Sequence, residues 1–470
     1  MVGADVLYLT VAELSARIRA RTLSPIELTE SYLARIDALD SKLHAFVTVM
    51  RDDARREARL AEQEIAAGKY RGPLHGIPYA AKDLLATRGA PTTWGAAPYK
   101  DQRFDYDATV ITRLRDAGAV LLGKLAMVEL AGGLGYTIPG ASLTGAARNP
   151  WDTSRWTCGS SSGSGGAVAA ALAAFAIGSE TWGSIICPAT FSGVSGLRPT
   201  FGLVSRHGAM PLSWTMDKLG PMARSAEDCG LVLAAIAGHD PLDDWSAQDI
   251  PNPTSQIPSS HAQLPSPNAL RVAFVAPEQG TEAEVAQAYE RAIEELRKTG
   301  VSPRQVKLPD LPFEAVAGVI ISAEATAAFE SLFRDGRVRQ LADEGAPLAQ
   351  AQARAITGTD LVKALRIRTV CQRAMAEFFG EHDLLLAPGE PMTAFAADVS
   401  FADASWSDPV GAMGNLCGLP GIAVPCGFGK ANLPASVSIV GGAFEDARVL
   451  ALARAYQAVT DWHRRRPPVG

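Results

Sequence analysis

Apolar and polar positions in the first third of the chain alternate between helical spacing and short apolar runs. The segment that begins at Ser24 opens with Ser-Pro, a favoured helix cap and first helical residue, and then repeats apolar residues at helical intervals. A later helical pattern ends at Gly118, where glycine can adopt the left-handed conformation that closes a helix. Helices are predicted at 24–43, 51–67 and 108–117, and strands at 76–82 and 119–124. Such alternation predicts a mixed or parallel sheet with helices on its faces.

The second half of the chain continues this alternation after an irregular interval. Residues 240–268 are rich in Pro, Ser and Asp and predict a long surface excursion. From 313 to 380 the pattern is helical, with Ala-rich segments interrupted by glycines. Strands are predicted at 270–277, 301–309, 383–388 and 421–428, and helices at 281–300 and 447–462. Because predicted strands occur over nearly the whole length, the sequence indicates one large α/β domain over 1–470 with a helical excursion at about 313–380.

The longest apolar run, Ala167 to Ile177, has no charged residue but is shorter than the roughly 18 residues that a membrane span needs. We expect it to form a buried, alanine-rich helix. The first residues, MVGADVLYLTVAELS, lack the basic and continuous apolar regions of a signal peptide. The sequence therefore predicts a protein that does not use a membrane.

Composition and charge narrow the function further. The 470 residues are 47% hydrophobic and 20% charged, as in ordinary globular proteins, with a formal net charge of -6. The basic run His463 to Arg466 is interpreted as a solvated tail, so no nucleic-acid partner is expected. Six cysteines stand far apart without a CxxC or a Cys/His pair of zinc spacing. This pattern predicts reduced thiols in a cytoplasmic protein and no metal site.

Serine and glycine are concentrated in the stretch TCGSSSGSGGAVAAALAAFAIGSETWGSIICPA, residues 157–189. A phosphate-binding loop would need either Gly-Lys-Ser/Thr or GxGxxG, and neither pattern is present. A flexible structural loop is a second interpretation. The third is a nucleophile turn, because Ser184 follows Thr181-Trp182-Gly183 and successive amides in such a turn can stabilise an oxyanion.

A serine nucleophile needs a base, and no histidine falls within this stretch. Lys82 ends the apolar segment GIPYAA, where burial would favour the neutral amine that can accept a proton. Taken alone, a lysine after a strand is more often exposed or paired with a carboxylate. Lys82 is therefore a candidate base only together with the serines.

These motifs together resemble the amidase signature hydrolases, which use a Ser-cis-Ser-Lys triad. The family pattern NPW-D-x-SR-x-x-GGSSGGS aligns without a gap with NPWDTSRWTCGSSSGS at 149–164. The nucleophile pattern G-S/T-D-x-G-G-S-I-R-x-P-A aligns with GSETWGSIICPA at 178–189, and the lysine pattern G-x-P-x-x-x-K-D with GIPYAAKD at 76–83. The motifs with a match lie within 76–228 and 383–446. The resemblance implies an amidase signature fold: a large mixed, mostly parallel β-sheet covered by helices on both faces.

The resemblance also implies a role for each residue of the triad. Ser184 would be the nucleophile, and Ser160, 24 positions earlier, the bridging serine after a cis Gly159–Ser160 peptide. Lys82 would be the neutral base that draws a proton through Ser160. The oxyanion hole would consist of the amides of Thr181, Trp182, Gly183 and Ser184. No cofactor is implied, since the triad supplies its own base.

Three further residues are candidates for contact with a substrate. Ala131 and Gly132 lie in the strip AGGLG, where family members place backbone against the substrate. A plain turn is the alternative for this strip. Ser161 is the third candidate, and helix capping is the alternative for Ser160 and Ser161.

Several positions depart from the family pattern. Trp182 replaces a glycine, and its indole either walls the substrate pocket or packs into the core. Ile186 stands where an arginine is frequent, which disfavours a substrate carboxylate there. Glu180 replaces an aspartate and would serve the same structural role with a longer side chain. Ser162 and Cys158 replace glycines, and the thiol of Cys158 is either reactive or buried and structural.

Three functions are compatible with these residues. The first is a stand-alone hydrolase, monomer or homodimer, of small and fairly apolar amides, whose chemistry also reaches esters, anilides and carbamates. The second is the amidase-like component of a tRNA-dependent amidotransferase, which releases ammonia from glutamine and needs a partner chain. The third is an inactive binding module. The intact triad favours an enzyme, and Trp182 and Ile186 favour the first function over the second.

Overall fold

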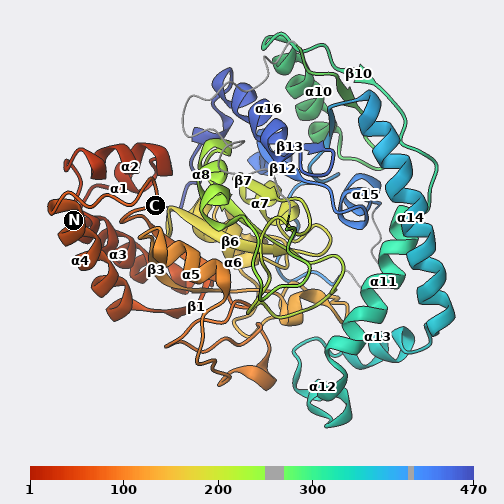
Figure 1. The fold of residues 1–470 in the computed structure, drawn as a ribbon, viewed down its shortest axis with the longest axis horizontal. Coiled ribbons are helices and arrows are strands. Elements are labelled where there is room, and N and C mark those ends of the chain that lie inside the picture. Colours follow the sequence, from red (N-terminus) through yellow and green to blue (C-terminus); the bar gives the residue numbers. More distant parts are fainter. Residues whose placement is uncertain (249–268, 401–406, 470) are drawn as a thin grey trace.

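The computed structural model describes residues 1–248, 269–400 and 407–469, so most of the predicted surface excursion at 240–268 lies outside the described residues. In the described part of the chain, 11 strands form one sheet that carries the fold (Figure 1). In spatial order the strands are β1 (Phe46–Val49), β3 (Val120–Leu125), β2 (Pro78–Lys82), β6 (Phe175–Glu180), β8 (Lys218–Ala223), β7 (Ser195–Arg198), β12 (Gly421–Phe428), β13 (Pro434–Gly441), β11 (Leu384–Pro388), β9 (Val272–Phe274) and β10 (Arg304–Gln305). A separate two-stranded ribbon consists of β4 (Arg148–Asn149) and β5 (Asp152–Trp156).

The sheet is mixed, which confirms the predicted α/β class. Strands β3, β2 and β6 run parallel to one another, as do β11, β9 and β10 toward the other edge. The centre is antiparallel, because β7 and β8 are neighbours and β12 and β13 form a hairpin. Strand β7 pairs with β12, so segments more than 200 residues apart lie side by side in the middle of the sheet.

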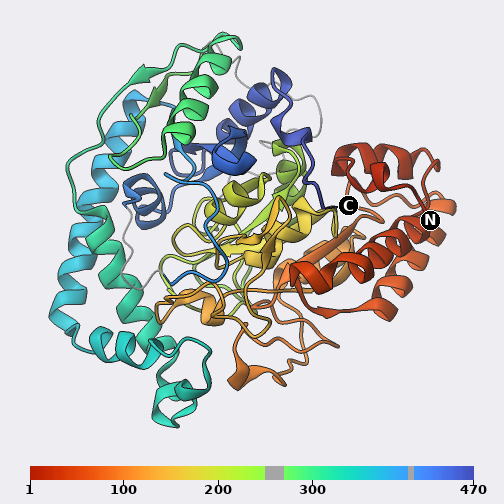
Figure 2. The same ribbon diagram turned by 180° about the vertical axis from the view of Figure 1, so that it is seen from behind.

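Helices lie on both faces of the sheet and extend beyond it at both ends (Figures 1 and 2). They are α1 (Ala4–Leu7), α2 (Val11–Arg19), α3 (Pro25–Leu43), α4 (Arg51–Ala66), α5 (Thr109–Asp116), α6 (Ser162–Ala169), α7 (Ile186–Ser192), α8 (Ala226–Ile236), α10 (Ala283–Arg297), α11 (Phe313–Ala328), α12 (Glu330–Arg334), α13 (Ala346–Ala353), α14 (Gly358–Glu381), α15 (Pro409–Leu416) and α16 (Asp446–Ala458). Figure 2 shows helices α1 to α4 at one end of the molecule and α11 to α14 at the other. The predicted cap of α3 is confirmed, since Ser24 Oγ accepts a hydrogen bond from the Glu27 amide.

The prediction of one buried helix over Ala167 to Ile177 is wrong. Helix α6 ends at Ala169, and Ala171 adopts the left-handed conformation with φ 55°. The amides of Ala171 and Leu172 bond back to the last turn in the pattern of a Schellman cap. Strand β6 then begins at Phe175 and pairs with β2. An apolar run buried on all sides has no periodicity that separates a helix from a central strand.

A bilayer crossing needs a long and strongly apolar helix. No helix in the described ranges combines that length with that hydrophobicity.

Candidate active site

Lys82 ends strand β2, and its side chain is fully buried. Its Nζ donates hydrogen bonds to Ser160 Oγ at 2.7 Å, to Ser161 Oγ at 2.9 Å and to Ser179 Oγ at 2.9 Å. Ser179 lies 97 positions from Lys82 and is brought beside it because β2 and β6 are neighbours in the sheet. The predicted contact between Lys82 and Ser160 is therefore present in the structure.

The surroundings of Lys82 favour its neutral form. Burial lowers the pKa of Lys82 well below its usual 10.5, because the ammonium ion loses its hydration. The carboxylates of Asp217 and Glu180 oppose this effect and raise the pKa, but they do not outweigh it. A lysine with a lowered pKa and a hydroxyl at hydrogen-bonding distance can accept a proton from that hydroxyl.

The segment that carries Ser160 turns sharply before α6. The Gly159–Ser160 peptide is cis, as the resemblance implied. Gly159 leaves no space for a side chain, since a Cβ there would lie 2.5 Å from Val128 Cγ2. Ser161 stands at the N-cap of α6, yet its hydroxyl makes no capping hydrogen bond. Because that hydroxyl is fully buried against Lys82 and Ser179, the structure does not support the predicted contact of Ser161 with a substrate.

Ser184 lies between the end of β6 and the first turn of α7 and is 8% exposed. Gly183 takes the left-handed conformation with φ 79°, whereas Trp182 does not require it. Within the described residues, the amides of Trp182, Gly183 and Ser184 donate no hydrogen bond. Unpaired donors gathered in one turn are what an oxyanion hole requires. The Ser161 amide donates to the Ser184 carbonyl at 3.3 Å and so connects this turn with the segment of Ser160.

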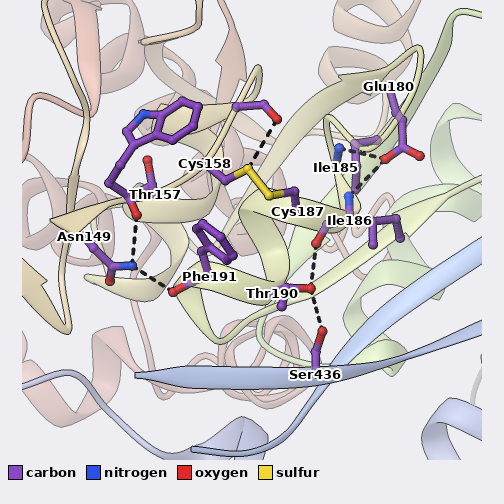
Figure 3. Close-up of a disulfide and its surroundings, with 12 residues drawn as sticks. Asn149, Thr157, Cys158, Glu180, Ile185, Ile186, Cys187, Thr190, Phe191 and Ser436 are labelled. Carbon is purple, nitrogen blue, oxygen red and sulfur yellow. Dashed lines mark hydrogen bonds between the residues drawn. A yellow bond between two sulfur atoms is a disulfide. The ribbon is translucent and has the colours of Figure 1, made fainter. Parts of the chain in front are cut away.

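Glu180, at the end of β6, holds the first turn of α7 in place (Figure 3). Its Oε2 accepts hydrogen bonds from the amides of Ile185 at 2.8 Å and Ile186 at 3.0 Å. Its Oε1 accepts from Arg198 at 2.9 Å and from Asn415 at 2.8 Å. Burial alone would raise the pKa of Glu180, but Arg198 and the Ile186 amide outweigh it and lower the pKa to about 2. Glu180 is thus an ionised anchor, in line with the structural role predicted for it.

The indole of Trp182 packs into the core and does not wall the cavity beside Thr181. Its Nε1 donates a hydrogen bond to Asp408 Oδ2 at 2.9 Å, and Asp408 in turn accepts from the Gly411 amide at the start of α15. The ring lies against a hydrophobic cluster built mainly from α11, α14 and α15. This contact decides between the two positions that the sequence left open for the ring.

Replacing Trp182 by phenylalanine is expected to destabilise the fold by about 1 kcal/mol, because Asp408 loses a hydrogen bond in a buried setting. The Michaelis constant for any amide that the enzyme cleaves should stay within twofold, since the ring does not line the cavity. Urea denaturation and steady-state kinetics measure the two effects. A large change in the Michaelis constant at unchanged stability would return the indole to the pocket wall.

A cavity of about 200 Å³ opens beside the nucleophile turn, with Ser179 and Thr181 in its lining. Ala131 also lines it, which places this predicted residue where a substrate would lie. Gly132 instead leaves room for Tyr136, because a Cβ at Gly132 would lie 2.7 Å from the Tyr136 ring. Only Ala131 of the predicted AGGLG pair therefore reaches the cavity.

Asp217 is a residue of this cavity that the sequence analysis did not single out. It accepts hydrogen bonds from Thr181 Oγ1 and from the amides of Leu212 at 2.8 Å and Ser213 at 3.0 Å. It therefore joins the oxyanion turn to the opposite wall, and its charge acts on Lys82. The signal was the matched motif MDKLGP, in which Asp217 is the one acidic residue.

In the described chain, the helical region 313–380 contributes no residue to the lining of this cavity. It supports the wall from outside instead. Glu324 on α11 accepts hydrogen bonds from Ser213 Oγ and from the Thr215 amide at 3.1 Å. Arg368 on α14 donates to the Thr215 carbonyl at 2.8 Å. The predicted role of this region in the pocket is therefore indirect.

Two cysteines beside the site form a disulfide, so the prediction of six reduced thiols is wrong for this pair. Cys158 and Cys187 are joined with a Cα–Cα distance of 5.9 Å (Figure 3). Their separation of 29 positions carries no recognisable motif, because the fold alone brings the serine segment against α7. The four free cysteines are buried: Cys229, Cys371, Cys417 and Cys426.

The family model described as Amidase matches residues 27–450. The chain belongs to the amidase family. A glutamyl-tRNA(Gln) amidotransferase A-type chain from Moorella thermoacetica is 36% identical, with 99% of each chain covered. The solved peptide amidase of Stenotrophomonas maltophilia is 34% identical with a TM-score of 0.79, covering 98% of each chain. The solved A-type chain of the glutamyl-tRNA(Gln) amidotransferase from Thermotoga maritima is 28% identical with a TM-score of 0.76, covering 97% of this chain and 95% of that one.

These relatives correct the first choice among the predicted functions. Further amidase-family relatives, 33 to 37% identical over nearly their whole length, carry the same glutamyl-tRNA(Gln) amidotransferase name. They do not support a stand-alone hydrolase of small apolar amides, esters or carbamates. That prediction weighed Trp182 and Ile186 as pocket residues. The indole of Trp182 instead packs into the core, and Ile186 is buried behind the turn.

The predicted absence of a macromolecular partner is wrong for the same reason. Relatives named as one component of a tRNA enzyme imply other chains and a tRNA. The prediction rested on a net charge of -6 and on the lack of a basic surface. The charge of one chain does not report on the surface that a multi-chain assembly offers to nucleic acid.

Proposed function

We propose that this amidase-family chain is the amide-hydrolysing component of a tRNA-dependent amidotransferase. It releases ammonia from an amide donor such as glutamine, and a partner chain uses the ammonia to convert glutamyl-tRNA(Gln). The observation that carries the proposal is the end-to-end similarity to the amide-hydrolysing chains of such enzymes, 36% identity over 99% of both chains.

The geometry around Lys82 supports the chemistry that this role needs. Neutral Lys82 takes a proton from Ser160 Oγ, 2.7 Å away, while Ser160 takes the proton of Ser184. Ser184 Oγ attacks the amide carbonyl, and the amides of the turn at 182–184 stabilise the oxyanion. Ammonia leaves with a proton returned along the same path. Water then cleaves the acyl-enzyme, so no cofactor takes part.

The cavity suits a small polar donor better than an apolar one. Its lining includes the guanidinium of Arg206 together with the carboxylates of Asp217, Asp243 and Asp244. Arg206 is paired with Asp243 at 3.1 Å, so both signs of charge are held in the same wall. An amino-acid amide carries both an ammonium and a carboxylate group and can pair with such a wall. The proposal also implies a cytoplasmic location, where aminoacyl-tRNA is made.

The proposal is tested by reconstitution. The purified chain replaces its counterpart in a mixture with the remaining chains of the Moorella thermoacetica amidotransferase. We expect ammonia release from L-glutamine and formation of glutaminyl-tRNA(Gln), both dependent on the added chains. The Ser184→Ala variant is the matched control and should give neither product.

Two outcomes would contradict this function. One is hydrolysis of nitroanilides by the chain alone, dependent on Ser184, with no ammonia from glutamine in any mixture. The other is glutaminyl-tRNA formation that persists with Ser184→Ala, which would remove this chain from the chemistry.

A further inference from the structure

The Cys158–Cys187 disulfide connects the two segments that carry the serines of the site. Cys158 lies two residues before Ser160, and Cys187 lies three residues after Ser184. Figure 3 shows the bridge spanning from the loop before α6 to the first turn of α7. A change at this bridge therefore acts on both serines and on no other part of the sheet.

The backbone at Cys158 indicates that the bridge is more than a filler of the core. Cys158 has φ 65°, in the left-handed region that favours glycine. A residue with a Cβ costs about 1 kcal/mol in this conformation. Cysteine is found here, at a position where the family pattern has glycine, and it is bonded to Cys187. The cross-link supplies a physical reason for a side chain at an unfavourable position.

Few other contacts hold the two serine segments to each other. The Ser161 amide donates to the Ser184 carbonyl at 3.3 Å, which is long for a backbone hydrogen bond. Lys82 holds Ser160, and Glu180 holds the amides that follow Ser184, but each of these contacts involves only one of the two segments. The disulfide is the covalent connection between them.

The surroundings of the bridge are apolar. Cys158 and Cys187 are 5% and 7% exposed and belong to a cluster with Val128, Trp156 and Phe191. They are buried, but neither is fully sealed from solvent, so a small dithiol can reach them after modest opening. In the cytoplasm, disulfides are typically transient and take part in catalysis or in redox sensing.

We propose that the Cys158–Cys187 disulfide positions Ser160 and Ser184 for catalysis and makes the site sensitive to dithiol reductants. The thiolate of a dithiol attacks one sulfur and forms a mixed disulfide, and its second thiol closes a ring on the reductant. Two electrons and two protons pass to the protein, which gains two thiols, while the dithiol becomes a disulfide. With the bridge open, α7 and the loop before α6 separate and proton transfer from Ser184 slows.

The first experiment measures the reactivity of Ser184 with a fluorophosphonate, which reacts with activated serines without needing the natural donor or a partner chain. The purified full chain is compared before and after dithiothreitol, with thiols titrated in each state. We expect two additional thiols and a fall of about tenfold in the labelling rate, restored on reoxidation. Because this readout needs only the triad, its outcome is independent of whether the amidotransferase proposal holds.

The second experiment uses variants. The double variant C158G/C187A removes the bridge and relieves the positive φ at residue 158. We expect slow labelling with or without dithiothreitol, at temperatures well below its thermal midpoint. The matched control Cys371→Ala alters a buried free thiol on α14 and should behave like the wild type.

The proposal is overturned by any of three results. One is a labelling rate unchanged when the two extra thiols have been titrated. Another is wild-type labelling in C158G/C187A. The third is the recovery of six free thiols from protein purified without reductant under air. A loss of labelling that merely follows unfolding, seen by circular dichroism at the same temperature, would also reject a positioning role.

Discussion

Replacing Ser184 by alanine is expected to lower amide hydrolysis at least about a thousandfold and to leave the fold intact. The hydroxyl supplies the atom that forms the acyl-enzyme, and nothing else in the turn can replace it. Within the described residues the Ser184 hydroxyl makes no hydrogen bond, so its removal leaves no buried group unpaired. Ammonia release in the reconstituted mixture measures the activity, and thermal unfolding measures the stability.

The Lys82→Met variant tests whether the residues act as a unit. Its loss should be comparable, and the double variant with Ser184→Ala should be no slower than either single one. In the wild type, hydrolysis should fall at acid pH as Lys82 takes up a proton, at a pH well below 10.5 because burial lowers its pKa. Ser162→Ala is the matched control in the same loop, since its hydroxyl makes only a 3.4 Å contact with the Ala126 carbonyl. Turnover that survives in Lys82→Met would assign the base elsewhere.

Features encoded by neighbouring residues could be predicted from the sequence. The Ser-Pro start of α3 and the glycine after α5 act within one helical turn, so local patterns find them. Lys82, Ser160 and Ser184 were found because three motifs keep their spacing across about 100 residues. The structure places Lys82 Nζ against Ser160 Oγ, as those motifs implied.

Features that depend on distant packing could not be predicted. The run from Ala167 to Ile177 is apolar at every position, so only its pairing with β2 reveals a strand. The Cys158–Cys187 bond and the hydrogen bond from Trp182 to Asp408 join residues 29 and 226 positions apart. No local pattern indicates either contact, and the misplaced indole led directly to the wrong choice of substrate class.

The same limit applies to the partner of the enzyme. The triad determines how an amide bond is broken, but it is common to amidases and to the amide-hydrolysing chains of amidotransferases. What distinguishes the two lies in the cavity wall and in surfaces that meet other chains. The wall at Arg206 and Asp217 became visible only when the loop at 206–217 was placed beside the nucleophile turn.

The Glu180→Gln variant is expected to lose about 3 to 5 kcal/mol of unfolding free energy. Glu180 and Arg198 are almost wholly buried, and the change leaves the Arg198 guanidinium without its charge partner. The first turn of α7 should also loosen, because the amides of Ile185 and Ile186 lose a charged acceptor. We therefore expect a fall in fluorophosphonate labelling of Ser184 of about tenfold or more, beyond the loss of stability.

The pH dependence gives this prediction a second readout. Because the folded pKa of Glu180 is about 2 against an ordinary value of 4.5, its contribution is complete above 4.5 and disappears as the pH falls toward 2. The stability difference between wild type and Glu180→Gln, measured by urea denaturation, should therefore shrink over that acid range. Glu180→Asp, which restores the residue of the family pattern, is the matched control and keeps the charge opposite Arg198. A Glu180→Gln protein as stable and as reactive as Glu180→Asp would show that Glu180 contributes shape alone, and the ion pair with Arg198 would then carry no part of the site.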